Sequence, residues 1–155
     1  MDVARGYLVI VMPSNFLLDD SLIVNLHVDA YKTEAYRIGA GDSGLKISNN
    51  KGDVGTVYDV KFLTAAGEPI TVTDKAVDLT FNYDPTAMAQ KGISLSTLKA
   101  YHWNSATDDW DIVANSYVSL ADNSVSATVS SFSRYLVLGI YVCNDGIDND
   151  GDGRV

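Results

Sequence analysis

The sequence predicts an all-β protein: an antiparallel β-sandwich of about eight or nine strands with one short helix, followed by an irregular, Asp-rich C-terminal segment. In several stretches apolar residues recur at every second position, which is the periodicity of strands that bury one face. Turn-forming residues separate these stretches. The acidic residues comprise 18 Asp and only two Glu, and this ratio disfavours a helical protein because Asp favours turns and caps over helix interiors.

Four stretches predict antiparallel strands with one buried and one exposed face: residues 20–31, 55–64, 76–83 and 123–130. Their predicted core positions are Leu22, Val24, Leu26, Val28, Ala30, Tyr58, Val60, Phe62, Val77, Leu79, Phe81, Tyr83, Val125, Ala127 and Val129. The alternate positions are mostly polar, so we expect Asp59, for example, on an exposed face.

Two further runs, residues 7–12 and 135–142, are almost continuously apolar. Such runs suit central strands that are covered on both faces, although a buried helix has the same apolar pattern. Residues 100–103 and 110–113 predict a hairpin with a polar tip.

The remaining local signals predict turns and one helix. Residues 66–69 and 121–123 are rich in turn formers. Residues 84–90 predict a short helix, because Asp84 is placed to cap it, Pro85 suits its first position and Gly92 follows its end.

Charge and composition narrow the possible partners. The net charge is −9, from 11 Lys and Arg against 20 Asp and Glu, which argues against nucleic acid because phosphate binding needs a basic face. No apolar run reaches the roughly 20 residues of a membrane-spanning helix. The single cysteine, Cys143, has no partner within the chain, so we expect its disulfide partner beyond Val155.

The segment after residue 142 predicts a calcium loop. We therefore expect a β-sandwich module over residues 1–142 and the start of a calcium-binding repeat over residues 143–155. The pattern Asp-x-Asp-x-Asp-Gly places carboxylates at alternate positions, where they can converge on one hard cation. The candidate Ca²⁺ ligands are the side chains of Asp145, Asp148, Asp150 and Asp152 and the backbone carbonyl of Arg154.

This predicted site is incomplete within the sequence. The twelfth loop position, which normally supplies a bidentate carboxylate, falls beyond Val155, so we expect weak binding by this chain. The alternative interpretation is an acidic terminus that is simply solvated. The regular alternation of Asp with other residues fits that alternative poorly.

Residues 143–153 resemble the calcium segments of thrombospondin type 3 repeats and of bacterial and archaeal surface proteins. The resemblance implies an extracellular or cell-surface location, a longer parent chain, and a second cysteine after the loop.

The body of the chain carries a second resemblance, strongest over residues 79–135. It rests on the apolar strand before Asp84, the hairpin containing Trp103 and Trp110, and the Phe132-Ser133 pair near its end. These features are similar to the β-sandwich shared by netrin receptors, ankyrins and zonula occludens proteins, which is related to the autoproteolysis domain of adhesion receptors. Surface proteins of bacteria and archaea carry similar modules, so the resemblance implies a module of such a protein. A cohesin-like scaffold domain is a weaker alternative.

Some members of that wider family cleave themselves within His-Phe-Ser, where the serine hydroxyl attacks the preceding carbonyl and the histidine acts as base. Here Ser131 stands at the histidine position, and serine cannot act as a base near neutral pH. The two histidines, His27 and His102, are distant in sequence. We therefore expect no self-cleavage at Phe132–Ser133 and no enzymatic activity.

The aromatic residues around the predicted hairpin suggest an alternative function. Tyr101, Trp103, Trp110 and Tyr117 lie close together in sequence, and on an exposed face they could stack against sugar rings. Packing of Trp103 against Trp110 across the hairpin is the favoured interpretation, because cross-strand aromatic pairs stabilise sheets.

The sequence thus predicts a non-enzymatic structural or adhesion module of a larger secreted or surface protein, joined to a calcium-stabilised stalk. Its expected partners are downstream domains of the same polypeptide and a surface protein or polysaccharide. The alternative is a carbohydrate-binding module that directs an extracellular enzyme to polysaccharide.

Overall fold

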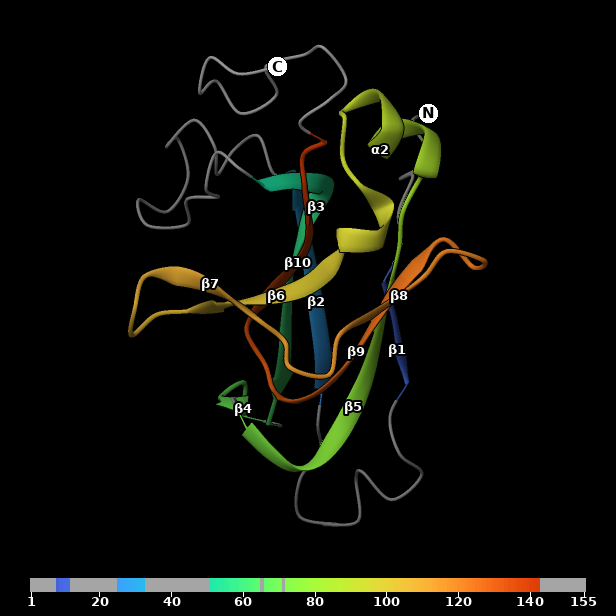
Figure 1. Cartoon of the computed structure of the whole chain (residues 1–155). Helices are drawn as coiled ribbons and strands as arrows, with labels where there is room; N and C mark the ends of the chain where they lie inside the picture. The colour runs from blue at the N-terminus through green and yellow to red at the C-terminus, as the bar shows by residue number, and fades with distance from the viewer. Residues whose placement is uncertain (1–7, 12–24, 33–50, 65, 71, 143–155) are drawn as a thin grey trace.

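Ten strands form two antiparallel sheets in the computed structural model, which describes residues 8–11, 25–32, 51–64, 66–70 and 72–142 (Figure 1). The four-stranded sheet has the order β1–β5–β9–β8. Its strands are β1 (Leu8–Val11), β5 (Val72–Asn82), β9 (Ser124–Ser131) and β8 (Tyr117–Ser119).

The six-stranded sheet has the order β2–β3–β10–β6–β7, with β4 paired to β3. Its strands are β2 (Asn25–Lys32), β3 (Lys51–Leu63), β10 (Arg134–Ile140), β6 (Lys99–Asn104), β7 (Asp109–Ile112) and β4 (Pro69–Ile70). The predicted all-β, β-sandwich-like architecture is confirmed. Figure 1 shows the β6–β7 and β8–β9 hairpins extending to opposite sides of the molecule.

Both sheets contribute side chains to one buried core. Its members from the strands are Tyr58, Val60, Phe62, Val77, Leu79, Phe81, Ala100, Val125, Ala127, Val129, Tyr135 and Val137. The alternation predicted for residues 76–83 and 123–130 is confirmed, because the apolar side chains at every second position of β5 and β9 are buried in this core. Burial of such side chains is the main favourable contribution to folding.

A second apolar cluster lies on the opposite face of the six-stranded sheet. This outer cluster contains Val57, Tyr101, Trp110, Leu136 and Leu138, with Trp103 packed against it. Successive side chains of a strand point to opposite faces, so β10 is covered on both of them. All four residues from Tyr135 to Leu138 are at most 1 % exposed, which confirms the prediction of a central strand there.

The prediction of one exposed face for residues 55–64 is wrong. Val57 lies in the outer cluster, and Asp59 is only 4 % exposed although it was expected to face water. β3 lies between β2 and β10, and the outer cluster covers the face that carries Val57. Two cations compensate the burial of the Asp59 carboxylate: Lys61 Nζ lies 2.7 Å and Arg134 Nε 3.7 Å from its Oδ2.

The prediction of a central strand for residues 7–12 is also wrong. Within the described residues, β1 pairs only with β5 and lies at the edge of the four-stranded sheet. Leu8 and Ile10 pack against the core, whereas Val9 and Val11 are exposed. The apolar run therefore covers one face only, because no second layer of described residues lies over the other.

The predicted helix is confirmed as α2 (Pro85–Gln90). The Asp84 carboxylate accepts hydrogen bonds from the backbone N–H groups of Thr86 and Ala87, so it caps the first turn. Gly92 follows the helix with φ +68°, a conformation that glycine adopts without steric cost. A short 3₁₀ turn, η1 (Leu95–Thr97), was not predicted and leads into β6.

Candidate functional site

The predicted calcium ligands lie outside the described residues. This applies to Asp145, Asp148, Asp150, Asp152 and Arg154 alike, so the loop remains a prediction. Within the part of the chain that the structure does describe, no group of three or more His, Cys, Asp or Glu side chains could hold a metal ion. None of the helices in that part is long and apolar enough to cross a membrane.

The Phe132–Ser133 segment forms a packed corner before β10. The Phe132 ring is buried and meets Phe62 edge-on, with 4.3 Å between the ring centroids. The Ser133 hydroxyl donates to the Arg134 carbonyl at 3.4 Å, and the Ser133 carbonyl accepts a bond from the Val60 N–H. These contacts tie the corner to β3, the neighbour of β10.

A tyrosine hydroxyl also holds this corner. Tyr135 is fully buried, and its hydroxyl donates to the Ser131 carbonyl four residues upstream. A tyrosine that bonds back to the preceding backbone is a recurrent device at sandwich corners. Burial raises the pKa of Tyr135, while hydrogen bonds with Ser131 and Ser133 partly offset that rise. The hydroxyl therefore stays protonated, as donation to the carbonyl requires.

The self-cleaving proteins use a histidine as base, and the chain has two histidines. His27 is in β2, whose side chains are not described. His102 lies in β6, opposite Tyr135 in the register, and the centroids of the two rings are 6.4 Å apart.

The predicted packing of the two tryptophans is confirmed. Trp103 and Trp110 are register partners of β6 and β7, and their rings meet edge-to-face with centroids 5.4 Å apart. Trp110 is only 5 % exposed, and its Nε1–H has no hydrogen-bond partner among the described residues. Tyr101 lies in the same cluster, with Lys51 Nζ 4.9 Å from the centroid of its ring. The Trp110 ring is thus part of the packed outer cluster, and Trp103 is partly buried against it.

The outer face of the four-stranded sheet is a surface that the sequence did not single out. One row crosses it from β1 to β8: Val9 pairs with Thr80, Thr80 with Ser126, and Ser126 with Tyr117. The Thr80 and Ser126 hydroxyls are 3.2 Å apart, as expected for neighbours on one face. Tyr117 is 61 % exposed, and the next residue, Val118, packs against the core, which places Tyr117 on the outer side.

A second row runs parallel to the first. Val11 pairs with Asp78, and Asp78 with Thr128. The Thr128 hydroxyl donates to the Asp78 carboxylate at 2.7 Å, and both side chains are exposed. We name these two rows the hydroxyl face; its members are Val9, Val11, Asp78, Thr80, Tyr117, Ser126 and Thr128.

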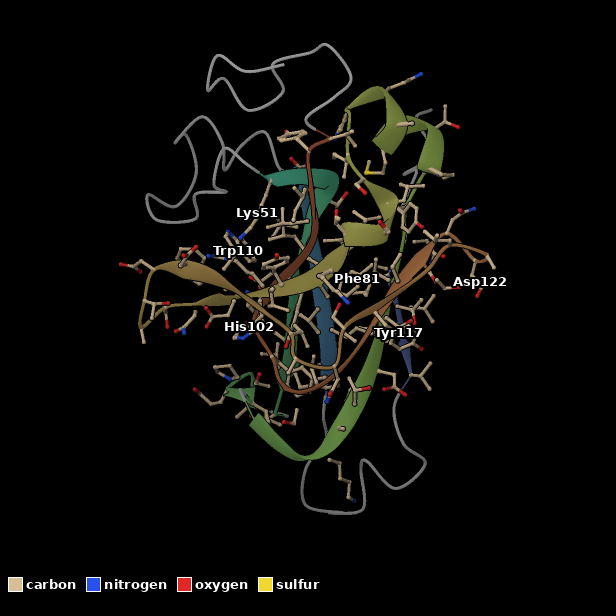
Figure 2. All side chains as sticks on the ribbon, viewed as in Figure 1. Lys51, Phe81, His102, Trp110, Tyr117 and Asp122 are labelled. Atoms are coloured by element: carbon tan, nitrogen blue, oxygen red, sulfur yellow. The ribbon has the colours of Figure 1, made fainter. Side chains whose placement is uncertain are left out.

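The hydroxyl face and the tryptophan hairpin are well separated. Figure 2 shows Trp110 and Lys51 on one side of the molecule, Tyr117 on the other side, and Phe81 between them. The part of the hydroxyl face that the sequence indicated was the set of polar residues at every second position of residues 76–83 and 123–130. That signal could not show which strands lie side by side.

Comparison of the chain with protein-family models, with curated proteins and with solved structures gave no match. The fold defines the class of this protein as all-β and β-sandwich-like.

Proposed function

We propose that the chain is a non-enzymatic structural or adhesion module of a larger extracellular or cell-surface protein, with a calcium-binding segment after residue 142. The observation that carries this proposal is the two-sided burial of the six-stranded sheet. β3 and β10 have apolar side chains packed on both faces, which suits a stiff spacer. The resemblance of residues 79–135 to sandwich modules of surface proteins supports the same function.

The alternative, a carbohydrate-binding module with its platform on the tryptophan hairpin, is less well supported. A sugar platform needs an aromatic face open to water, whereas Trp110 is buried against its neighbours. The two tryptophan rings also meet edge-to-face rather than side by side in one plane.

The non-enzymatic part of the proposal is tested by intact-mass measurement. After prolonged incubation at neutral pH, purified protein should give a single mass, because Ser131 provides no base at the corner and the Ser133 hydroxyl already donates to a carbonyl. Two fragments divided between Phe132 and Ser133 would show self-cleavage and contradict the proposal.

The calcium-binding part is tested by titration calorimetry. We expect a dissociation constant of about 10⁻³ M or weaker, at the weak end of the range for extracellular calcium modules. Both Asp148→Ala and Asp150→Ala should abolish the binding heat. The control is Asp108→Asn, which removes one carboxylate at the exposed hairpin tip; asparagine tolerates the positive φ of 52° at that position. Tight binding that persists in both Ala variants would place the principal site within the sandwich instead.

A further inference from the structure

We propose that the hydroxyl face binds a neutral polysaccharide. This inference rests on the adhesion function proposed above and gives it a ligand class and a surface. The face presents exposed apolar side chains at β1, hydroxyls and one carboxylate on β5 and β9, and an exposed tyrosine ring at β8.

The arrangement matches the two kinds of surface that a sugar ring presents. A pyranose has apolar C–H faces and hydroxyl groups around its rim. The Tyr117 ring can cover a C–H face, because most of it is open to water. Thr80 and Ser126, its neighbours in the same row, can bond rim hydroxyls as donor or acceptor.

The polar groups of the face keep bonding capacity after their mutual contacts are made. Each hydroxyl has one donor and two acceptor positions, and a carboxylate has about four acceptor positions. The two hydrogen bonds within the face, between Thr80 and Ser126 and from Thr128 to Asp78, use only part of this capacity. The remaining positions can bond to water or to the hydroxyl groups of a polyol.

The dimensions suit an extended chain rather than a single sugar. Neighbouring strands lie about 4.8 Å apart, so the row from Val9 to Tyr117 extends roughly 14 Å across the four strands. Side chains two residues apart on one strand add the second row at roughly 7 Å. Both apolar ends and the polar centre can therefore contact successive units of one chain.

Charge argues against polyanions. The chain carries a net charge of −9, neither row contains Lys or Arg, and Asp78 contributes a negative charge to the face. Nucleic acids, sulfated glycans and acidic lipids would therefore be repelled. A neutral polyol meets no such repulsion.

Composition argues against a protein partner. The cores of protein interfaces are enriched in aromatic residues, Met and Arg and depleted in Ser. The centre of the hydroxyl face is instead made of Thr80, Ser126, Asp78 and Thr128, with Tyr117 as its one aromatic residue.

The test is retention of the purified chain on polysaccharides. The probes are cellulose, chitin, xylan and mannan as neutral chains, and polygalacturonate and heparin as acidic ones, in pull-down and affinity electrophoresis. We expect retention on at least one neutral chain and on neither acidic one. Tyr117→Ala should weaken it tenfold or more, as roughly expected for an aromatic anchor. Thr128→Val should weaken it about fivefold, the typical effect of one lost hydrogen bond.

Two control variants separate loss of binding from loss of structure. Tyr117→Phe keeps the ring and should retain most of the binding. Ile112→Ala removes a similarly exposed apolar residue from the other sheet and should leave the binding unchanged. Failure to bind any neutral chain, or binding unaffected by Tyr117→Ala, would overturn the inference. New reducing ends on the bound polysaccharide would instead contradict the non-enzymatic function and leave the binding face intact.

Discussion

Replacing Trp110 by alanine should lower the free energy of unfolding by about 3–5 kcal/mol, the usual range for a buried large aromatic side chain. The ring is buried in the outer cluster and meets Trp103 edge-to-face, so its removal leaves a cavity on the six-stranded sheet. Denaturant unfolding followed by circular dichroism measures the effect.

A matched control lies two residues away on the same strand. Ile112 is 55 % exposed, and Ile112→Ala should cost less than about 1 kcal/mol, mostly through lost β propensity. Trp110→Phe should fall between the two, because it keeps an aromatic ring and removes an indole N–H that has no partner in the described part of the chain. If Trp110→Ala leaves the melting temperature unchanged, the Trp110 ring does not contribute to packing. The alternative function, a sugar-binding platform formed by Trp103 and Trp110, would then be favoured.

Replacing Leu136 by alanine should cost about 2–5 kcal/mol. Leu136 is fully buried at the centre of β10, but it faces the outer cluster rather than the core between the sheets. Its register partners are Val57 on β3 and Tyr101 on β6, so the cavity would adjoin side chains of β3, β10 and β6 on the outer face of the sheet. The same unfolding measurement applies.

The control for Leu136 is Ile140, at the end of the same strand. It is 54 % exposed, and Ile140→Ala should cost less than about 1 kcal/mol. Equal losses in the two variants would show that the outer face of β10 is solvated, which would remove the observation on which the proposed spacer role depends.

The strands and the helix were largely predictable because their signals are local. Alternation over residues 76–83 and 123–130 identified β5 and β9 and their buried parity, and Asp84 with Pro85 marked the start of α2. The apolar run from residue 135 identified β10 as a strand covered on both faces. In each case the residues that carry the signal are within one turn or one strand of each other.

The predictions that were wrong concerned the surroundings of a strand, that is, its position in the sheet and the residues that cover its faces. The run at residues 7–12 looked like a central strand, but in the structure β1 pairs only with β5 among the described residues. Asp59 looked exposed, but it is buried, and Lys61 and Arg134 neutralise its carboxylate. Neither outcome could be derived from the alternation of apolar and polar residues. Alternation shows which side chains of a strand share a face, but not which other residues cover that face.

By itself, therefore, the sequence determined the all-β class, the positions of the longer strands and of α2, and which side chains of a strand share a face; the short strands β4 and β8 and the turn η1 were not predicted. Only the tertiary structure decided the order of the strands, the second apolar layer on the six-stranded sheet, and the hydroxyl face. The physical reason is that strand pairing joins residues far apart in the chain, as when Val9, Thr80, Ser126 and Tyr117 form one row. A period of two within each strand is compatible with many such pairings, and the packing of the whole chain selects one of them.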